Sequence, residues 1–375
     1  MSRTIIIGGG VIGMLTARML HQEQADEIIL LEKGQLGQES SWAGGGILSP
    51  LYPWRYADEI SLLSQYGQQH YPAVCQDLFA ETGIDPECID SGLIMLGHDE
   101  LAEAQQWAKR FAADLQIKNG TEQLQNIEPQ LNPQFDKALW MPNIGQVRNP
   151  RILKSLIASL RKRQISIHEN TEAQDFIKNS HDEIVAVKTN QGQFEADRVI
   201  VCSGAWSGQF TALQQVAVTV KPVLGEMILF NAKPNQLKRI VMQQGRYLIP
   251  RKDGKILCGS TLAFKQFNKQ TSQTAKQELH QAAIRMAPFL KDVPIEHHWC
   301  GLRPGSPNGI PYVGEHPEIK NLYINTGHYR YGVTIGLGTI RLLLDHLSQK
   351  PSFMDIQNFR LDREREATVE FQMAS

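Results

Sequence analysis

Three glycines near the N-terminus could hold a dinucleotide. Gly8, Gly10 and Gly13 match the G-x-G-x-x-G pattern within the segment TIIIGGGVIG. In this pattern the first glycine permits a tight turn, the second lets the backbone approach a pyrophosphate, and the third lets a helix pack closely on a strand. The helix that follows would present free N–H groups to the phosphates at its N-terminus. The glycines predict a dinucleotide site but do not identify the dinucleotide.

An acidic residue at a suitable distance from the glycines limits which dinucleotide the site can bind. Glu32 directly follows the segment EIILL at 27–31 and comes 19 residues after Gly13. A carboxylate at this position accepts hydrogen bonds from a ribose 2′-hydroxyl and repels a 2′-phosphate. The sequence therefore favours FAD or NAD over NADP. The location of the motif at the start of the chain favours FAD, which reflects a habit of flavoproteins and not a physical requirement.

A βαβ unit must position these residues. Residues 4–7 are apolar and β-branched and predict a short buried strand. A helix is expected to begin near Val11, and residues 27–31 predict the second parallel strand. The segment SSWAGGGIL at 40–48 is rich in hydroxyls and small residues, which let a backbone pass close to a flat cofactor.

The middle of the chain predicts further elements of two kinds. A buried strand ending in small residues at 196–204 suits a nucleotide-binding sheet, whereas later segments predict antiparallel strands. Those strands are expected at 221–230, 246–251 and 255–261, and helices at 58–82, 99–116 and about 271–287. Segments typical of a nucleotide-binding sheet occur near the start, in the middle and near the end of the chain. The second domain is therefore expected to be inserted between them in two pieces.

The composition limits the classes of protein that the chain can belong to. Its 375 residues exceed what one simple core usually holds, so two domains are expected. Lys and Arg total 38 against 39 Asp and Glu, so no bulk positive field would attract nucleic acid or anionic lipid. The sequence has no run of about 18 apolar residues, so no membrane span is expected.

Cysteine usage and the N-terminus bear on location. The five cysteines are scattered and show neither a disulfide framework nor zinc spacing, so no metal is expected and a reducing compartment fits best. The short N-terminal apolar run leads straight into the glycines without a small-residue cleavage site, so no signal peptide is expected. The expected location is the cytoplasm.

An aromatic segment, LYPWRY at 51–56, has two interpretations that the sequence does not separate. It could form a lid or wall over a pocket, because binding residues are often carried by loops. It could equally be a set of aromatics packed into a seam between domains.

Seven motifs, spread from end to end, carry a resemblance to a known family. They are GGGVIG at 8–13, SSWAGGGIL at 40–48, VIVCSGAWS at 199–207, RYLIPR at 246–251, GSTL at 259–262, GLRPGSPNGIPYVG at 301–314 and GHYRYGV at 327–333. Together with LLEK at 30–33 they resemble the glycine oxidase branch of the D-amino-acid-oxidase-like flavoproteins. The motifs as a set are specific to the family and less specific to the substrate.

The resemblance implies an architecture. The fold class is α/β, with a doubly wound, Rossmann-like FAD-binding domain and an inserted antiparallel-sheet domain for the substrate. The FAD-binding domain would comprise 1–82, 145–218 and 296–375, and the substrate-binding domain 83–144 and 219–295.

The resemblance also implies an activity. Glycine is the principal expected substrate, with sarcosine and D-alanine as further ones. Hydride transfer from Cα to non-covalently bound FAD gives an imine, whose hydrolysis releases the 2-oxo acid and ammonia, and oxygen becomes hydrogen peroxide. This activity serves thiamine thiazole synthesis in bacteria, and relatives are often tetramers, so a homo-oligomer is expected.

The substrate's carboxylate needs a clamp, for which the planar fork of an arginine is suited. By similarity Arg303, in a GLRPG segment expected to form a turn, is the first candidate. Arg330 matches a second active-site arginine, and Tyr247 matches a tyrosine whose hydroxyl helps to hold the carboxylate. No protein base is assigned, because an amine that arrives neutral needs none.

The motifs and the resemblance assign cofactor contacts to 24 residues. These are Gly8, Gly10, Val11, Ile12, Gly13, Glu32, Lys33, Ser40, Ser41, Gly44, Gly45, Gly46, Ile47, Ala173, Ser203, Gly204, Trp206, Arg303, His328, Tyr329, Arg330, Tyr331, Gly332 and Val333. The start of the last helix, after Tyr331, is expected to stabilise negative charge on the reduced flavin.

Two positions depart from the family's pattern. Gly245 stands where some glycine oxidases have a histidine, which puts pocket size in doubt. Cys300 lies near the region where sarcosine-oxidase relatives tether their flavin, although a small buried residue explains it more simply.

Two other functions stay open on the sequence alone. One is a D-amino-acid dehydrogenase that passes electrons to a quinone or carrier. The other is an FAD-binding protein without turnover, against which Arg303 and Tyr247 argue.

Overall fold

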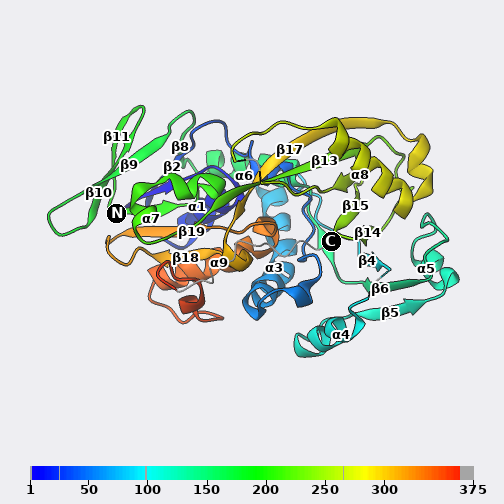
Figure 1. The fold of residues 1–375 in the computed structure, drawn as a ribbon. Helices are drawn as coiled ribbons and strands as arrows, with labels where there is room; N and C mark the ends of the chain where they lie inside the picture. The colour runs from blue at the N-terminus through cyan, green and yellow to red at the C-terminus, as the bar shows by residue number, and fades with distance from the viewer. Residues whose placement is uncertain (1, 25, 98, 265, 364–375) are drawn as a thin grey trace.

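The computed structural model describes residues 2–24, 26–97, 99–264 and 266–363, and its two largest sheets lie in different halves of the molecule (Figure 1). The six-stranded sheet has the order β18-β19-β12-β1-β2-β8. Its strands are β1 (Arg3–Ile7), β2 (Glu27–Leu31), β8 (Ser166–His168), β12 (Arg198–Val201), β18 (Tyr312–Glu315) and β19 (Leu322–Thr326). The pairs among β8, β2, β1, β12 and β19 are parallel, and β18 joins antiparallel.

Both faces of this sheet are buried, which explains why its strands are apolar throughout. Alternate residues of β1 fall into different cores: Ile6 packs with the helices on one face, and Ile5 and Ile7 pack on the other. The helices on the first face are α1 (Val11–Glu23), α3 (Asp58–Thr82), α6 (Asn149–Lys162) and α9 (Gly332–Leu347). The other face is covered by α7 (Thr211–Gln215) and by a three-stranded sheet of β9 (Ala173–Lys178), β10 (Ile184–Thr189) and β11 (Gly192–Glu195).

The eight-stranded sheet has the order β17-β13-β16-β15-β14-β4-β6-β5 and is antiparallel except between β14 and β4. Its strands are β4 (Leu93–Leu96), β5 (Gln116–Asn119), β6 (Lys137–Met141), β13 (Lys221–Phe230), β14 (Ile240–Gln243), β15 (Arg246–Pro250), β16 (Ile256–Gly259) and β17 (Ile295–Gly305). The helix α8 (Gln273–Met286) packs on one face. Shorter elements are β3 (Ile89–Asp90), β7 (Gly145–Gln146), α2 (Ser40–Ala43), α4 (Leu101–Arg110) and α5 (Thr121–Ile127).

The long strands β13 and β17 run between the two halves of the molecule (Figure 1). Their pairing extends from Lys221 opposite Gly305 to Phe230 opposite Ile295. This ladder carries residues of the antiparallel sheet to the edge of the nucleotide-type sheet. The predicted fold class, a doubly wound α/β sheet with an antiparallel companion, is confirmed.

Two local predictions are wrong. The helix expected at 99–116 ends at Arg110, because Ala112 adopts a φ of +50° and Gln116–Asn119 pairs with β6 instead. The GLRPG segment is not a turn but the end of β17, where Arg303 lies opposite Val223. Proline is tolerated there because β17 is an edge strand.

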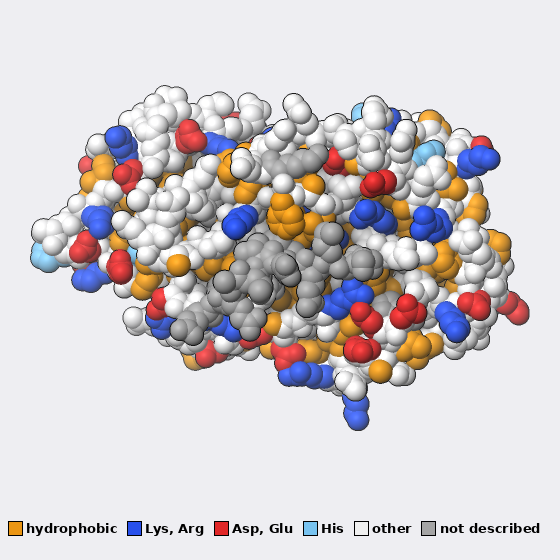
Figure 2. Space-filling model, in the orientation of Figure 1, with side chains coloured by type: hydrophobic (Ala, Val, Ile, Leu, Met, Phe, Trp, Pro, Cys, Tyr) orange, Lys and Arg blue, Asp and Glu red, His pale blue; other side chains and the backbone are white. Residues whose placement is uncertain are grey.

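The molecular surface carries both signs of charge. On the face in Figure 2, Lys and Arg side chains are interspersed with Asp and Glu, in keeping with the formal net charge of -1. Across the described ranges, no helix combines the length and apolar character needed to cross a membrane.

Candidate active site

A cavity of about 480 Å³ lies where the two large sheets meet. It opens at the carboxyl ends of β1, β2, β12 and β19, which is where open α/β sheets bind their ligands. The volume is typical of small-molecule and cofactor sites. Its walls come from segments that are distant in the sequence, including the first strand, the β13–β17 ladder and the start of α9.

All of the predicted site residues but one line this cavity. Those that do are Gly8, Gly10, Val11, Ile12, Glu32, Lys33, Ser40, Ser41, Gly44, Gly45, Gly46, Ile47, Ala173, Ser203, Gly204, Trp206, Tyr247, Arg303, His328, Tyr329, Arg330, Tyr331, Gly332 and Val333. Gly13 is the exception. A methyl group on Gly13 would lie 1.9 Å from the Gly8 carbonyl oxygen, so this glycine lets α1 pack against the turn, as the motif predicts.

The turn after β1 requires glycine for two reasons. Gly8 has a φ of +112°, which an L-residue with a side chain rarely adopts. A methyl group on Gly8 would also lie 2.5 Å from the Cys202 carbonyl oxygen at the end of β12. The first turn of α1 contains no acidic residue, so its positive end faces the cavity without a built-in counter-charge.

Glu32 is buried at the end of β2 and is fixed by the backbone. Its Oε2 accepts a hydrogen bond from the Gly9 N–H at 2.7 Å, and Oε1 accepts one from the Gly34 N–H at 2.8 Å. A carboxylate has about four acceptor sites, so capacity remains for hydroxyls of a ligand in the cavity.

We call Gly44–Ile47 the cofactor loop. Gly46 has a φ of +75°, and a methyl group there would lie 2.0 Å from the Val147 carbonyl oxygen. The Val147 N–H donates to the Gly46 carbonyl at 2.9 Å, and Thr334 Oγ1 in the first turn of α9 donates to the Ile47 carbonyl at 2.8 Å. The loop is therefore held in a single path between α9 and the segment before α6.

The end of the cavity near Glu32 is lined by a cation and an aromatic ring. Lys33 Nζ lies 3.5 Å from the centroid of the Trp206 ring, a cation–π contact. Burial lowers the pKa of Lys33 from its ordinary value. Phe267, from the loop before α8, also packs against Trp206, at 5.6 Å between ring centroids. A planar group would find both a ring and a positive charge here.

His328 is buried beside the start of α9 and is held by Thr339, at 2.9 Å between Nε2 and Oγ1. Burial lowers the pKa of His328 to about 3. The imidazole is therefore neutral at physiological pH, which suits a structural role and not that of a proton acceptor.

Arg303 projects from β17 into the end of the cavity that the antiparallel sheet forms. Its Nη2 donates to Ser260 Oγ at 2.7 Å and its Nη1 donates to the Thr261 carbonyl at 3.3 Å. The guanidinium lies over Gly225, where a methyl group would be 2.1 Å from Nη2. These bonds use part of the five N–H donors of an arginine.

A second guanidinium and a phenol share this end of the cavity. Burial, followed by the positive charge of Arg330, lowers the pKa of Arg303. Burial also acts to lower the pKa of Arg330, but Tyr331, Tyr56 and Tyr247 act to raise it, and the net shift is upward. Both arginines remain protonated. Neither has an ion pair with a carboxylate in the described part of the chain, so the site favours an anion.

The aromatic segment begins at the cavity wall and continues into a packed cluster. Leu51 lines the cavity, and the Tyr52 hydroxyl accepts a hydrogen bond from the Gly245 N–H at 3.2 Å. Trp54 instead packs against Trp107 and bonds Glu100. The segment is thus part of the cavity wall at its start, and whether its packed part lies between two domains stays a prediction.

Cys300 does not line the cavity. Its neighbour Gly301 and Arg303 do, and side chains alternate between the two faces of a strand. The orientation of Cys300 argues against a tether to a ligand in this cavity.

Sequence reasoning missed several residues of the cavity wall. Gly225, Gly301, Met227 and Asn149 all line it. The two glycines carried a readable signal, because a glycine inside a strand often marks a close approach. Asn149 anchors helix α2 by donating from Nδ2 to the Ser41 carbonyl at 2.6 Å, which no local pattern indicates.

Comparison with known proteins identifies the family. The family model described as "FAD dependent oxidoreductase" (DAO) matches residues 3–346. The chain belongs to this family. It is therefore an enzyme that uses FAD, as the sequence predicted.

Several known proteins are similar to this chain over nearly its whole length. A glycine oxidase of Pseudomonas aeruginosa is 42% identical over 354 residues, which cover 94% of this chain and 96% of that protein. A bifunctional protein ThiO/ThiG of Synechocystis is 28% identical, over 94% of this chain and 52% of that protein. The crystal structure of glycine oxidase from Geobacillus kaustophilus superposes with a TM-score of 0.90 at 27% identity, covering 98% of this chain and 100% of that one.

The cavity of this oxidoreductase fits FAD on its own geometry. Gly204 has open space where a side chain would stand, and Gly10 would meet only the Ser41 hydroxyl, so a large planar cofactor can lie against the backbone. Glu32 retains acceptor capacity for ribose hydroxyls. The N-cap residues of α1 and α9 provide no side-chain cap, although the Val11 N–H of α1 donates to Ser41 Oγ at 2.9 Å. These helix N-termini suit phosphates and a reduced flavin respectively.

Proposed function

We propose that this enzyme oxidises glycine, and more slowly sarcosine and D-alanine, with oxygen as electron acceptor. The products are the 2-oxo acid, ammonia (methylamine from sarcosine) and hydrogen peroxide. The observation that carries the proposal is the pair Arg303 and Arg330, which face one end of the cavity beside Tyr247 with no carboxylate paired to either among the described residues. The names of the relatives support glycine as the substrate and thiamine biosynthesis as the context.

Each residue would act on the substrate in a defined way. Arg303 presents its fork to the carboxylate, to which charge-assisted hydrogen bonds contribute about 1.5–3 kcal/mol each. The Tyr247 hydroxyl gives a further bond, and Arg330 adds positive charge to the same end. FAD, when bound, accepts the hydride from Cα.

The remainder of the predicted cofactor set would hold FAD along the cavity. We assign Glu32 to the ribose hydroxyls, the turn at Gly8 and Gly10 with the start of α1 to the pyrophosphate, and the cofactor loop to the flavin end. Lys33, Ala173 and Trp206 would surround the nucleotide, and the segment from His328 to Val333 would pass the pyrimidine end of the flavin.

The division into domains, the assembly and the location are parts of the same proposal. The FAD-binding domain is proposed as 1–82, 145–218 and 296–375, with the substrate-binding domain between its segments. Five free thiols support the cytoplasm as the location. A homo-oligomer, with a tetramer as the first expectation, is checked by light scattering on the purified protein.

One experiment tests the proposed activity. Glycine added without oxygen should bleach the flavin absorbance, and readmitted air should restore it with one peroxide per turnover. Bleaching without peroxide release would instead indicate a dehydrogenase that passes its electrons to a carrier. If no small amine bleaches the flavin, the proposed function is wrong.

A further inference from the structure

Arg251 joins the strand that carries Tyr247 to the cofactor loop. Tyr247 and Ile249 have the same parity along β15, so they lie on one face of the sheet, and Arg251 directly follows the end of the strand. All three meet Gly45. Arg251 Nη2 donates to the Gly45 carbonyl at 2.7 Å, and a methyl group on Gly45 would lie 2.8 Å from Ile249 Cδ1 and 3.3 Å from the Tyr247 ring.

The same guanidinium also bonds a third segment. Arg251 Nη1 donates to Gln146 Oε1 at 2.6 Å and approaches the Val147 carbonyl at 3.3 Å. Gln146 Nε2 donates back to the Pro250 carbonyl at 2.9 Å, which closes a ring of bonds around the end of β15. Because the Val147 N–H in turn holds the Gly46 carbonyl, one side chain fixes the loop from two sides.

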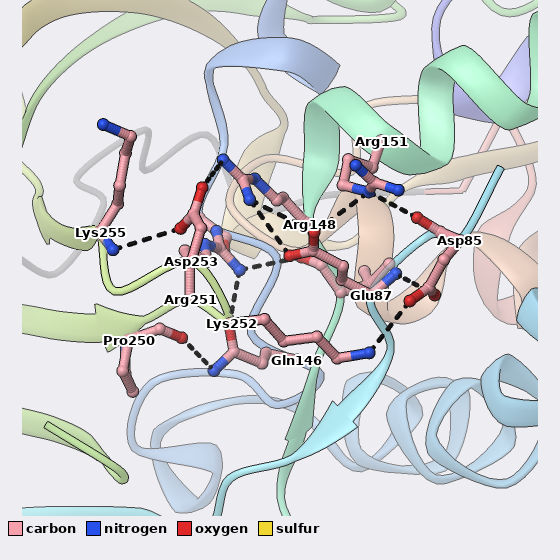
Figure 3. A network of polar contacts seen from close by, with 12 residues as sticks. Asp85, Glu87, Gln146, Arg148, Arg151, Pro250, Arg251, Lys252, Asp253 and Lys255 are labelled. Carbon is pink, nitrogen blue, oxygen red and sulfur yellow. Dashed lines mark hydrogen bonds and ion pairs between the residues drawn. The ribbon is translucent and has the colours of Figure 1, made fainter. Parts of the chain in front are cut away.

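The carboxylates near Arg251 form their ion pairs with other arginines. Arg148 forms ion pairs with Glu87 at 3.2 Å and with Asp253 at 2.9 Å, and Arg151 forms one with Glu87 at 3.1 Å (Figure 3). Arg251 has no ion pair with a carboxylate in the described part of the chain, and its bonded acceptors are carbonyl oxygens of the backbone or of an amide. Its side chain is almost fully buried, with 7% of the residue exposed. Burying a cation without an ion pair is costly, and the hydrogen bonds to Gln146, Val147 and Gly45 offset part of that cost.

We propose that Arg251 is a positioning residue that sets the distance between the cofactor loop and Tyr247. The inference rests on the proposed function, because Tyr247 matters only if a carboxylate is held beside the flavin. A lysine keeps the charge, but its three donors sit on a single nitrogen, whereas Arg251 uses Nη1 for Gln146 and Val147 and Nη2 for Gly45. In Arg251→Lys the side chain should therefore no longer link the cofactor loop to the end of β15, while the buried positive charge remains.

The test compares Arg251→Lys with Arg151→Lys. Arg151 belongs to the same polar network, and the structure shows no contact between its side chain and the cofactor loop. Three quantities are measured for each variant: Tm, the Kd of FAD for the apoprotein, and the limiting rate of anaerobic flavin bleaching by glycine at full FAD occupancy. A misplacement of about 1 Å can cost a hundredfold in rate, so Arg251→Lys should bleach about ten- to a hundredfold more slowly. Its FAD Kd should rise severalfold, and Arg151→Lys should leave both within about twofold.

Equal bleaching rates in the two folded variants would overturn the proposal, since a merely structural role lowers Tm without slowing the occupied enzyme. If Arg251→Lys does not fold, Gly45→Ala replaces it, because the added methyl pushes the loop from Ile249 and Tyr247 without touching the guanidinium. An unchanged bleaching rate in Gly45→Ala would also overturn it. If glycine fails to bleach even the parent enzyme, the proposed function is wrong, and the comparison of FAD Kd values alone then decides the role of Arg251.

Discussion

Replacing Gly225 by alanine should displace the Arg303 guanidinium without removing its charge. A methyl group on Gly225 would lie 2.1 Å from Nη2 and 2.3 Å from Cζ of Arg303, whereas ordinary van der Waals contact begins near 3.4 Å. The guanidinium must therefore retreat by about 1.3 Å. Because the clashing atoms are the end of a flexible side chain, the cost to folding should be small.

The cost to substrate binding should be large. A shift of this size breaks at least one bond of a bidentate pair with the carboxylate, and a hydrogen bond to a charged group contributes about 1.5–3 kcal/mol. The KM for glycine should rise about 10- to 150-fold, since each 1.36 kcal/mol is a factor of ten. Peroxide release measures KM. The Kd of glycolate, which replaces the amine by a hydroxyl, is measured from the change in the flavin spectrum.

The control is a double-mutant cycle with Arg303→Met. If Gly225 acts only through Arg303, adding Gly225→Ala to Arg303→Met should change neither the KM nor the glycolate Kd further. An unchanged KM in the folded Gly225→Ala single variant would refute the reasoning. An equal loss in both backgrounds would refute it as well, by showing that the methyl acts on something other than Arg303.

Three further outcomes are expected. Glu32→Gln should raise the FAD Kd about tenfold in apoprotein titrations, because the amide loses the charge and one of the two oxygens that bond the Gly9 and Gly34 N–H groups; an unchanged Kd would show that Glu32 is not a cofactor ligand. The depressed pKa of His328, about 3, means that below pH 6.5 the unfolded chain binds a proton that the folded chain excludes. Stability should fall by up to about 1.4 kcal/mol per pH unit as pH drops from 6.5 towards 3, and His328→Gln should flatten the fall in Tm; parallel pH profiles for the two proteins would contradict this. Finally, acid denaturation should release all yellow colour from the chain, because Cys300 does not line the cavity; colour retained on the precipitate would mean a covalent flavin.

The Glu32 end of the cavity, where we propose that the nucleotide binds, could be predicted from the sequence because its determinants are local. Gly8 and Gly13 act within one turn and one helix, and Glu32 follows the next strand, so spacing alone fixes their relation. Three strands of the antiparallel sheet, β13, β15 and β16, could be predicted for the same reason. The error at 99–116 arose where a helix-like pattern runs into a segment that instead pairs with β6.

The Arg303 end of the cavity, where we propose that the substrate binds, could not be derived from local sequence patterns. Arg303 was assigned through a family resemblance, and its surroundings were expected to be a turn. What gives it space is Gly225, 78 residues earlier and beside it only because β13 pairs with β17. The bond from Arg251 to Gly45 likewise spans 206 residues. Contacts of this kind follow from strand pairing and from the packing of the two sheets, and a short segment of sequence does not determine either.

The glycines of the antiparallel sheet link this packing to the chemistry. Gly225 and Gly301 lie in the interior of β13 and β17, where glycine costs about 0.5–1 kcal/mol relative to alanine. Neither has the left-handed φ that would require glycine. Gly225 gives the Arg303 guanidinium a place to lie flat, and Gly301 lets α2 approach within 2.5 Å of where its methyl would be. Gly225 therefore trades sheet stability for a shallow floor beneath the Arg303 charge, and Gly301 trades it for close packing of α2. In the proposed function, the bare backbone at Gly225 leaves room for the carboxylate of a small amino acid beside Arg303, and its depth is set by the backbone of β13.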